Sequence, residues 1–233
     1  MTSSIRKYLF GGDRPWSPLD WTGSDDTVRG GISYSKLICS EDQRVAVFTG
    51  NLDTQTLGGA GFASQRTTRN FGVLDLSAYA GIILDIQETD HKQYTFILKD
   101  TTLPPKLDGR EQSSAGWEYS FSASEPGESV QVFWSDFKPT YRGREMEDAP
   151  PLNISNITCC SLMMRSFFGT QEGPFRLGLT SIAAFGDTNT RDSGSFSDFD
   201  MEKRQAIIDE RVLQNTGSDN SWSGMIAKIF CIG

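Results

Sequence analysis

Histidine is almost absent from this sequence, in which His91 is the single example among 233 residues. One imidazole leaves no histidine cluster for a metal ion and a single candidate base for a Ser/His/Asp triad. His91 stands in a polar segment, residues 89–92, which we expect to form an exposed hairpin turn. Chemistry that depends on several histidines is therefore excluded.

The usual signatures of catalysis and of cofactor binding are missing as well. The sequence has no Gly-x-Ser-x-Gly elbow, phosphate-cradling loop or dinucleotide fingerprint in a strand-to-helix setting. The glycine-rich run at residues 58–61 precedes a predicted strand, which is a poor position for a nucleotide-binding turn. We therefore expect no cofactor and no metal, and any acid or base must be Asp, Glu, Lys, Arg or Tyr.

Cysteine is scarce, and the four examples lack the close spacing of a zinc site: Cys39, Cys159, Cys160 and Cys231. Without a secretory signal before them, we interpret them as reduced thiols. The first ten residues hold no long apolar stretch, and Gly11, Gly12 and Pro15 interrupt any amphipathic presequence. We therefore expect a cytoplasmic rather than a mitochondrial protein.

The sequence has no apolar run long enough to span a bilayer, and its acidic residues outnumber its basic residues. Lys and Arg total 22 against 30 Asp and Glu, which gives a net charge of -8 and a pI near 4.7. Nucleic-acid binding needs clustered Lys and Arg that outweigh local acids, so we expect no nucleic-acid partner and no membrane insertion. This balance favours a neutral or cationic partner.

Short runs of aromatic and branched residues, separated by Gly, Pro, Asp and Asn, recur along most of the chain. This pattern is typical of an antiparallel sandwich. The predicted strands are residues 33–37, 45–51, 61–67, 81–87, 94–99, 117–122, 129–133, 158–165 and 175–184. The sequence therefore predicts an all-β fold, a jelly-roll β-sandwich that occupies residues 1–185.

Two stretches are predicted to be irregular loops, residues 100–116 and 138–156, because each contains a Pro-Pro pair. The composition changes after residue 185, where we predict a polar linker, a short helix over residues 199–213 and an apolar tail packed on the sandwich. Three apolar residues of that helix form a stripe, which we interpret as a docking face on the domain rather than a partner site: Met201, Ile208 and Val212.

Four predicted strands each carry a charged residue inside an apolar pattern: Arg66, Lys99, Glu118 and Arg165. If these strands are neighbours, the four charges share one face of a sheet. Together with Ser64, Thr95, Ser120 and Met163 they form a mixed polar and apolar groove, while the alternate aromatic residues fill the core. The alternative is an ordinary solvated sheet face on which Glu118 pairs with a lysine or arginine across strands.

A polar loop at residues 21–31 combines Trp21, Asp25, Asp26 and Arg29 with two glycines. Two adjacent carboxylates can contribute to a calcium site, although the spacing is not that of an EF-hand. The interpretation that we favour is that Asp25 and Asp26 cap turns and hold Arg29. A calcium-stabilised lectin-like domain is accordingly the last of our hypotheses.

Several segments jointly resemble one protein family: residues 21–33 (WTGSDDTVRGGIS), 58–66 (GGAGFASQR), 75–79 (DLSAY), 94–100 (YTFILKD), 134–137 (WSDF) with Arg142 and Gly143, 163–167 (MMRSF) and 173–175 (GPF). In order and spacing they resemble the complex I intermediate-associated protein family of the thirty-kilodalton type. The resemblance covers about residues 16–185. It implies a galactose-binding-domain-like jelly roll and a chaperone role in the assembly of respiratory complex I. The chain is similar to the shorter, non-mitochondrial fungal members.

Two functions fit these observations. The first is a cofactor-free binding module, resembling a complex I assembly factor, that binds a protein or a small ligand on a concave sheet face; exposed aromatics such as Trp21 or Trp134 support it. The second is a cofactor-independent dehydratase, cyclase or pericyclase, such as a Diels–Alderase, of fungal secondary metabolism. In that enzyme Glu118 acts as general base, Lys99, Arg66 and Arg165 polarise the substrate, and the loop that carries Arg142 closes over it.

Overall fold

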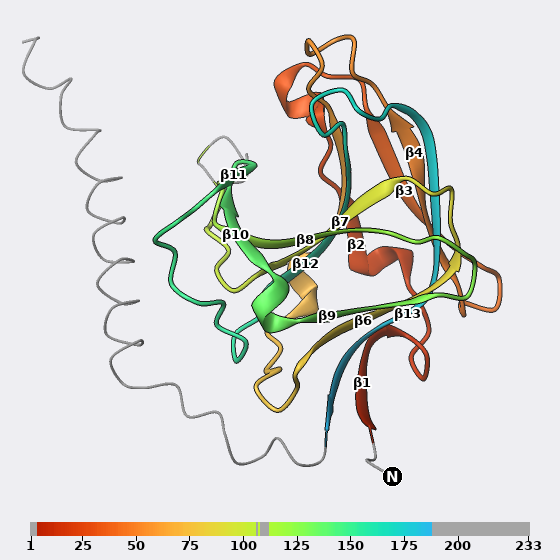
Figure 1. The fold of residues 1–233 in the computed structure, drawn as a ribbon, viewed down its shortest axis with the longest axis vertical. Coiled ribbons are helices and arrows are strands. Elements are labelled where there is room, and N and C mark those ends of the chain that lie inside the picture. Colours follow the sequence, from red (N-terminus) through yellow and green to blue (C-terminus); the bar gives the residue numbers. More distant parts are fainter. Residues whose placement is uncertain (1–3, 106, 108–111, 188–233) are drawn as a thin grey trace, which may run out of the picture. The chain divides into compact units, whose positions relative to one another are not determined.

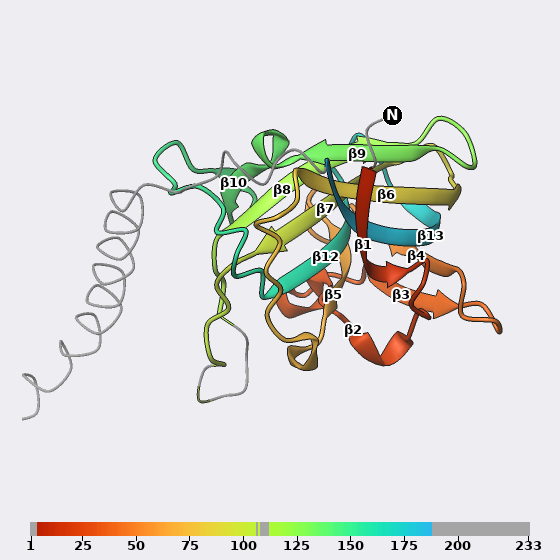
Figure 2. The same cartoon turned by 90° about the horizontal axis from the view of Figure 1, so that it is seen from below.

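Two antiparallel sheets face each other across the hydrophobic core (Figures 1 and 2). The computed structural model describes residues 4–105, 107 and 112–187. Within them every strand pairing is antiparallel, as the short runs and turn residues of the sequence predict. The fold is an all-β jelly-roll sandwich.

One sheet has six strands: β1 (Ser4–Gly11), β3 (Tyr34–Cys39), β4 (Ala46–Leu52), β6 (Gly81–Glu88), β9 (Ser129–Phe133) and β13 (Gly173–Asp187). Their order is β3-β4-β13-β6-β9, and β1 also pairs with β13. Strand β13 has 15 residues, so β4 pairs with its first half and β1 with its second half along one edge. The other edge of β13 pairs with β6.

The other sheet has seven strands: β2 (Trp21–Gly23), β5 (Phe62–Thr67), β7 (Gln93–Lys99), β8 (Gly116–Ser122), β10 (Lys138–Tyr141), β11 (Arg144–Glu145) and β12 (Cys159–Arg165). Their order is β11-β10-β8-β7-β12-β5-β2. Four short 3-10 helices lie in the connections: η1 (Pro18–Asp20), η2 (Asp26–Arg29), η3 (Arg69–Phe71) and η4 (Trp134–Asp136).

Aromatic and branched side chains from the two inner faces form the core. Tyr94, Phe96 and Leu98 point inward from β7 and are almost fully buried, and the ring of Tyr94 lies 6.1 Å from that of Phe48 on the opposite sheet. Burying one such side chain stabilises a fold by roughly 1.5–3 kcal/mol. The phenol of Tyr94 donates a hydrogen bond to Asp90, and desolvation, followed by the charge of Asp90, raises its pKa.

All nine strands predicted from the sequence are present, and their ends agree within three residues. Four strands were not predicted: β1, β2, β10 and β11. The expectation that residues 138–156 are irregular was wrong at β10 and β11, because β10 gains its pairing from the edge of β8, which local propensity does not reveal. The predicted helix at residues 199–213 and the apolar tail lie outside the described residues.

Two further findings concern the described part of the chain. Its three cysteines, Cys39, Cys159 and Cys160, are free thiols, and burial raises the pKa of Cys160 well above its usual value. No helix in it has the length and apolar character that crossing a membrane requires.

Candidate functional site

A row of side chains crosses the outward face of the seven-stranded sheet. Glu118 on β8 stands opposite Ile97 on β7, Ile97 opposite Ser161 on β12, and Ser161 opposite Arg66 on β5. Directly opposed residues of antiparallel strands share a face. Lys99 is two residues from Ile97 along β7, and Arg165 is four residues from Ser161 along β12. Residues an even number of positions apart on a strand share a face, so the charged residues Arg66, Lys99, Glu118 and Arg165 all lie on this face.

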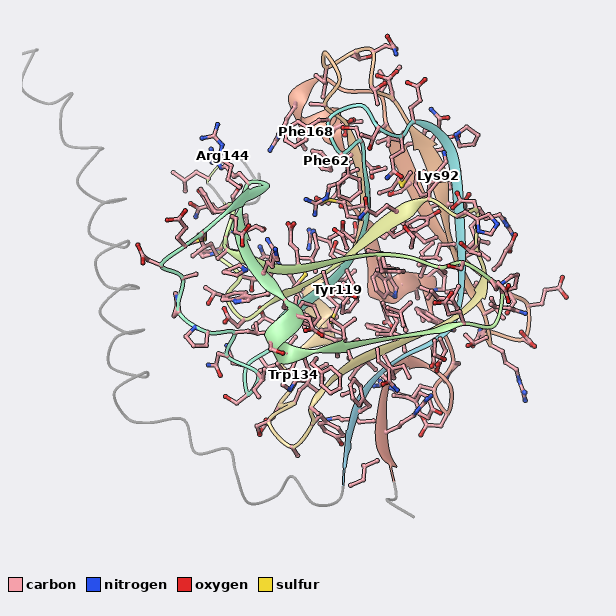
Figure 3. The ribbon with its side chains drawn as sticks, in the orientation of Figure 1. Phe62, Lys92, Tyr119, Trp134, Arg144 and Phe168 are labelled. Atoms are coloured by element: carbon pink, nitrogen blue, oxygen red, sulfur yellow. The ribbon has the colours of Figure 1, made fainter. Side chains whose placement is uncertain are left out.

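A groove of about 660 Å³ lies over this face. Its walls come from residues 58–62, from the β10–β11 hairpin and from the turn after β12. Figure 3 shows Phe62 and Phe168 on one side of the region and Arg144 of the hairpin on the other. The groove also includes eight of the residues that sequence analysis singled out: Arg29, Ser64, Arg66, Lys99, Glu118, Arg142, Met163 and Arg165.

The groove is strongly cationic. Its described lining contains five cationic side chains and one carboxylate, that of Glu118. In a chain of net charge -8 this is a local excess of four positive charges. The overall charge of the sequence favoured a neutral or cationic partner, and the groove has the opposite preference because the acidic residues lie elsewhere.

The carboxylate of Glu118 is held by one of those cations. Arg165 Nη2 lies 2.6 Å from Glu118 Oε2, and the two side chains are 20% and 15% exposed. The guanidinium carbon of Arg165 also lies 5.5 Å from the centre of the Phe167 ring. Its Nε atom is buried and has no hydrogen-bond partner among the described residues. Arg165 is thus fixed in the floor of the groove by Glu118 and Phe167.

The other cations reach the groove from separate segments. Lys99 Nζ lies 3.3 Å from Ser114 Oγ, which is a long hydrogen bond. Arg29 is exposed and lies over the ring of Phe62, with 5.4 Å between its guanidinium carbon and the ring centre. Arg142, at the tip of the β10–β11 hairpin, lies in the same way over Tyr141 at 5.3 Å. An anion in the groove therefore meets positive charge on the floor and on both walls.

Asp25 and Asp26 accept hydrogen bonds from backbone amides and serine hydroxyls. Asp25 accepts hydrogen bonds from the Ser35 amide and hydroxyl and from the Ser64 amide. Asp26 is fully buried and accepts from the amide and hydroxyl of Ser33 and from the Phe62 amide. Since β2 ends at Gly23, these carboxylates take over the edge amides of β5 beyond it.

Neither Asp25 nor Asp26 lines the groove, and a ligand-binding role for them stays a prediction. Within the described residues, Glu118 is the one carboxylate of the groove lining, and no group of three metal-binding side chains occurs among them. Instead the two aspartates fix the backbone that carries Phe62 and Ser64 into the groove.

Three other predicted ligand residues do not line the groove. Trp21 is 5% exposed and packs in the core against Phe10, because it faces inward from β2. Thr95 and Ser120 share the outward face with the groove, but their hydroxyls lie 3.0 Å apart and bond to each other. Trp134 is half-buried and donates from Nε1 to the Tyr79 carbonyl, so neither tryptophan supplies an exposed aromatic surface.

Sequence reasoning missed the aromatic rim of the groove: Phe62, Phe167 and Phe168. Phe168 is fully exposed. The signal was available in residues 166–169 (SFFG), where two aromatic residues follow the end of a strand and precede a glycine.

A second cavity of about 270 Å³ adjoins the groove. The two share four lining residues: Arg66, Lys99, Ser114 and Cys159. The cationic region is therefore elongated, with Arg66 and Lys99 at the junction.

Comparisons with known proteins agree with this fold. A family 11 carbohydrate-binding module from Clostridium thermocellum, solved in complex with a β-1,3-1,4-mixed-linked tetrasaccharide, aligns with a TM-score of 0.52 at 15% identity, over 78% of this chain and 95% of that chain. A second structure of a family 11 module from the same organism, that of a cellulosomal cellulase, gives 0.50 at 15% identity, over 77% and 94%. At this identity the likeness shows the fold alone.

Sequence comparison is more specific. An uncharacterized protein of Schizosaccharomyces pombe is 45% identical over 181 residues, which are 76% of this chain and 82% of that protein. The sequence model of complex I intermediate-associated protein 30 (CIA30) matches residues 9–179. The chain therefore belongs to the CIA30 family, as its motifs indicated.

Proposed function

We propose that this protein is a cofactor-free binding module that holds a small anionic ligand in the groove on the outer face of the seven-stranded sheet. One observation carries the proposal: five cationic side chains and a single carboxylate line a groove of about 660 Å³ in a chain of net charge -8. Side chains that repel one another are kept together at a cost in stability, which an anionic ligand offsets.

The construction of the groove supports binding. Its floor is regular sheet, and the carboxylates of Asp25 and Asp26 fix the strand that carries Phe62 and Ser64. A site on rigid strands loses little conformational entropy when a ligand arrives. The family 11 module with its bound tetrasaccharide adds carbohydrate as a ligand class to consider for this groove.

Calorimetric titration with a tricarboxylate tests the proposal. The wild-type protein is compared with Lys99→Gln and Arg142→Gln, which each remove one groove charge, and with Lys36→Gln, which removes an exposed charge on the six-stranded sheet. We expect weaker binding for the two groove variants at an equal or slightly higher melting temperature, because each relieves repulsion in the groove, and no change in binding for Lys36→Gln. Equal binding by all four proteins contradicts the proposal.

A second candidate is a cofactor-independent dehydratase, cyclase or pericyclase that uses the same groove. The observation in its favour is that Glu118, the one described carboxylate of the lining, lies among cations that polarise a substrate oxygen. A role as an assembly factor for a protein complex, which the family name suggests, is the third candidate. Co-purification of membrane-complex subunits, lost in Arg142→Gln, favours it.

We also propose a cytoplasmic location. The three cysteines of the described residues are unpaired, and two of them are buried. Free thiols are typical of a reducing compartment. Fluorescence microscopy of the tagged full chain in a fungal host tests this directly.

A further inference from the structure

Phe168 stands at the rim of the groove with its ring fully exposed. It belongs to the turn between β12 and β13, in which three successive residues have positive φ: Phe167 at 44°, Phe168 at 61° and Gly169 at 85°. The left-handed region suits glycine, whereas other L-residues placed there are destabilised by contact of the Cβ atom with the backbone. Two successive phenylalanines in this conformation are therefore strained.

The ends of this turn are held firmly. The Ser166 carbonyl accepts from the amides of Gly169 at 3.0 Å and Thr170 at 2.9 Å, and Ser166 bonds the backbone of Gly61 through its own amide and its hydroxyl. The side-chain amide of Gln171 donates to the carbonyls of Arg165 at 2.7 Å and Gln93 at 2.8 Å. These hydrogen bonds hold the turn in its strained conformation. The ring of Phe168 therefore stays exposed to solvent at the rim of the groove.

The two phenylalanines have different surroundings. Phe167 is half-buried and its ring lies under the guanidinium of Arg165. Phe168 is fully exposed, so both faces of its ring are open to solvent. An exposed apolar ring held in a strained backbone stabilises nothing in the free protein, which points to a role in contact with a ligand.

The remaining lining defines the chemistry of that ligand. Besides its cations, the groove carries the hydroxyl side chains of Ser24, Ser113 and Ser114. Four further lining hydroxyls also bond to the backbone: Ser64, Thr140 and Ser161 donate to carbonyls, and Ser166 accepts from the Gly61 amide. Hydroxyls suit a ligand rich in hydroxyls, cations suit carboxylate or another anionic group, and an open aromatic face suits the apolar face of a ring. A sugar ring that bears a negative charge offers all three.

We infer that the groove binds an acidic carbohydrate and that Phe168 is the platform on which one sugar ring stacks. This inference rests on the proposed function and names its ligand class. The cations of the groove, Arg142 and Lys99 among them, bind the charged groups of the sugar, while the strained turn fixes the position of the ring.

Three probes separate the contribution of ligand charge to binding from that of the sugar ring. Trigalacturonate has three carboxylates on sugar rings, tricarballylate has three carboxylates without a ring, and cellotriose has rings without charge. Each is titrated into the wild-type protein, Phe168→Ala, Phe168→Trp and Tyr34→Ala, the last being a control that removes an exposed aromatic of β3 on the other sheet. Backbone amide NMR shifts of Phe168 and Gly169 report contact at the turn.

We expect trigalacturonate to bind the wild-type protein about two- to tenfold more tightly than tricarballylate, which is the range that one aromatic contact contributes. Phe168→Ala abolishes this difference and leaves tricarballylate binding unchanged, while Phe168→Trp and Tyr34→Ala behave as wild type. The amides of Phe168 and Gly169 shift with trigalacturonate and not with tricarballylate.

The contrary outcomes are distinct. Equal binding of the two anions, or an equal loss of both in Phe168→Ala, overturns the role of Phe168 and leaves the anion-binding function standing. Failure of both anions to bind overturns the proposed function itself. Cellotriose binding as tightly as trigalacturonate overturns the requirement for charge.

Discussion

The guanidinium of Arg165 on β12 reaches across strand β7 and places Nη2 2.6 Å from Oε2 of Glu118 on β8. The outward residues of β7 between them, Thr95 and Ile97, are buried. This ion pair is the point in the groove where positive charge is neutralised, and it gives the variants of the two residues different expected effects.

Glu118→Gln removes the one carboxylate of the described groove lining and frees Arg165. If the protein binds anions, its affinity for tricarballylate rises, by about two- to tenfold for a charge-assisted contact at a largely buried site. If Glu118 is a general base, the same variant loses all turnover. Calorimetry at low and high ionic strength, with Glu41→Gln as an exposed control, separates the two, since screening reduces the gain at high salt.

Arg165→Ala leaves the carboxylate of Glu118 mostly buried without its partner. We expect a loss of roughly 1–3 kcal/mol in the free energy of unfolding, below the value for a fully buried pair because both groups keep some exposure. Urea denaturation measures it. In the double variant Arg165→Ala/Glu118→Gln we expect much of the lost unfolding free energy to be recovered. If the losses of the two single variants simply add in the double variant, the ion-pair explanation is wrong.

Asp26→Asn replaces an acceptor-only carboxylate by a group in which one end donates. Asp26 Oδ1 accepts from the Ser33 amide, and Oδ2 accepts from the Ser33 hydroxyl and the Phe62 amide. In asparagine the amide nitrogen replaces one of these oxygens, so a donor then faces a donor. The expected loss is about 1–3 kcal/mol of unfolding free energy. Chemical denaturation tests it against Asp13→Asn, an exposed control for which no change is expected.

Phe168→Gly is expected to raise stability while it weakens the binding of trigalacturonate. Glycine accepts the positive φ of this position without strain, and after its larger unfolded-state entropy is subtracted the gain is up to about 1 kcal/mol. The comparison is with Gly169→Ala, which introduces the same strain at φ 85° and lowers the melting temperature. A lower melting temperature for Phe168→Gly than for wild type would contradict the inference that the backbone of Phe168 is strained.

Glu172 makes stability depend on pH at the turn before β13. The hydrogen bond from Thr54, followed by that from Gln55, lowers the pKa of Glu172. Its contribution to stability is therefore complete above its unfolded pKa of about 4.3 and is lost as the pH falls through the lower folded value. Melting temperatures between pH 6 and pH 3 are expected to fall less steeply for Glu172→Gln than for wild type. Parallel curves contradict the assignment.

Local pattern was sufficient to predict nine of the 13 described strands and, for neighbouring strands, the shared face of Arg66, Lys99, Glu118 and Arg165. Each of those charges interrupts an apolar alternation, and alternation fixes which side of a strand a residue faces. The strand order, which brings the four together, is a property of the whole chain.

Other features depend on contacts between distant residues. Asp25 meets the Ser64 amide across 39 positions of sequence, so its role as a backbone acceptor is invisible locally. The residues next to Trp21 in the sequence do not show whether its side chain faces the core or the solvent. The left-handed conformation of Phe168 is imposed by bonds from Ser166 and Gln171, and nothing in phenylalanine itself predicts it.

The length and position of β13 have a consequence for biosynthesis. This strand is the middle member of the six-stranded sheet, yet it occupies residues 173–187 and pairs with β1, which is synthesised well before it. Until residue 187 has left the ribosomal tunnel, β1, β4 and β6 have exposed edges and no common partner. Formation of the sandwich therefore has to wait for translation of this segment, and the nascent chain needs protection from aggregation during that interval.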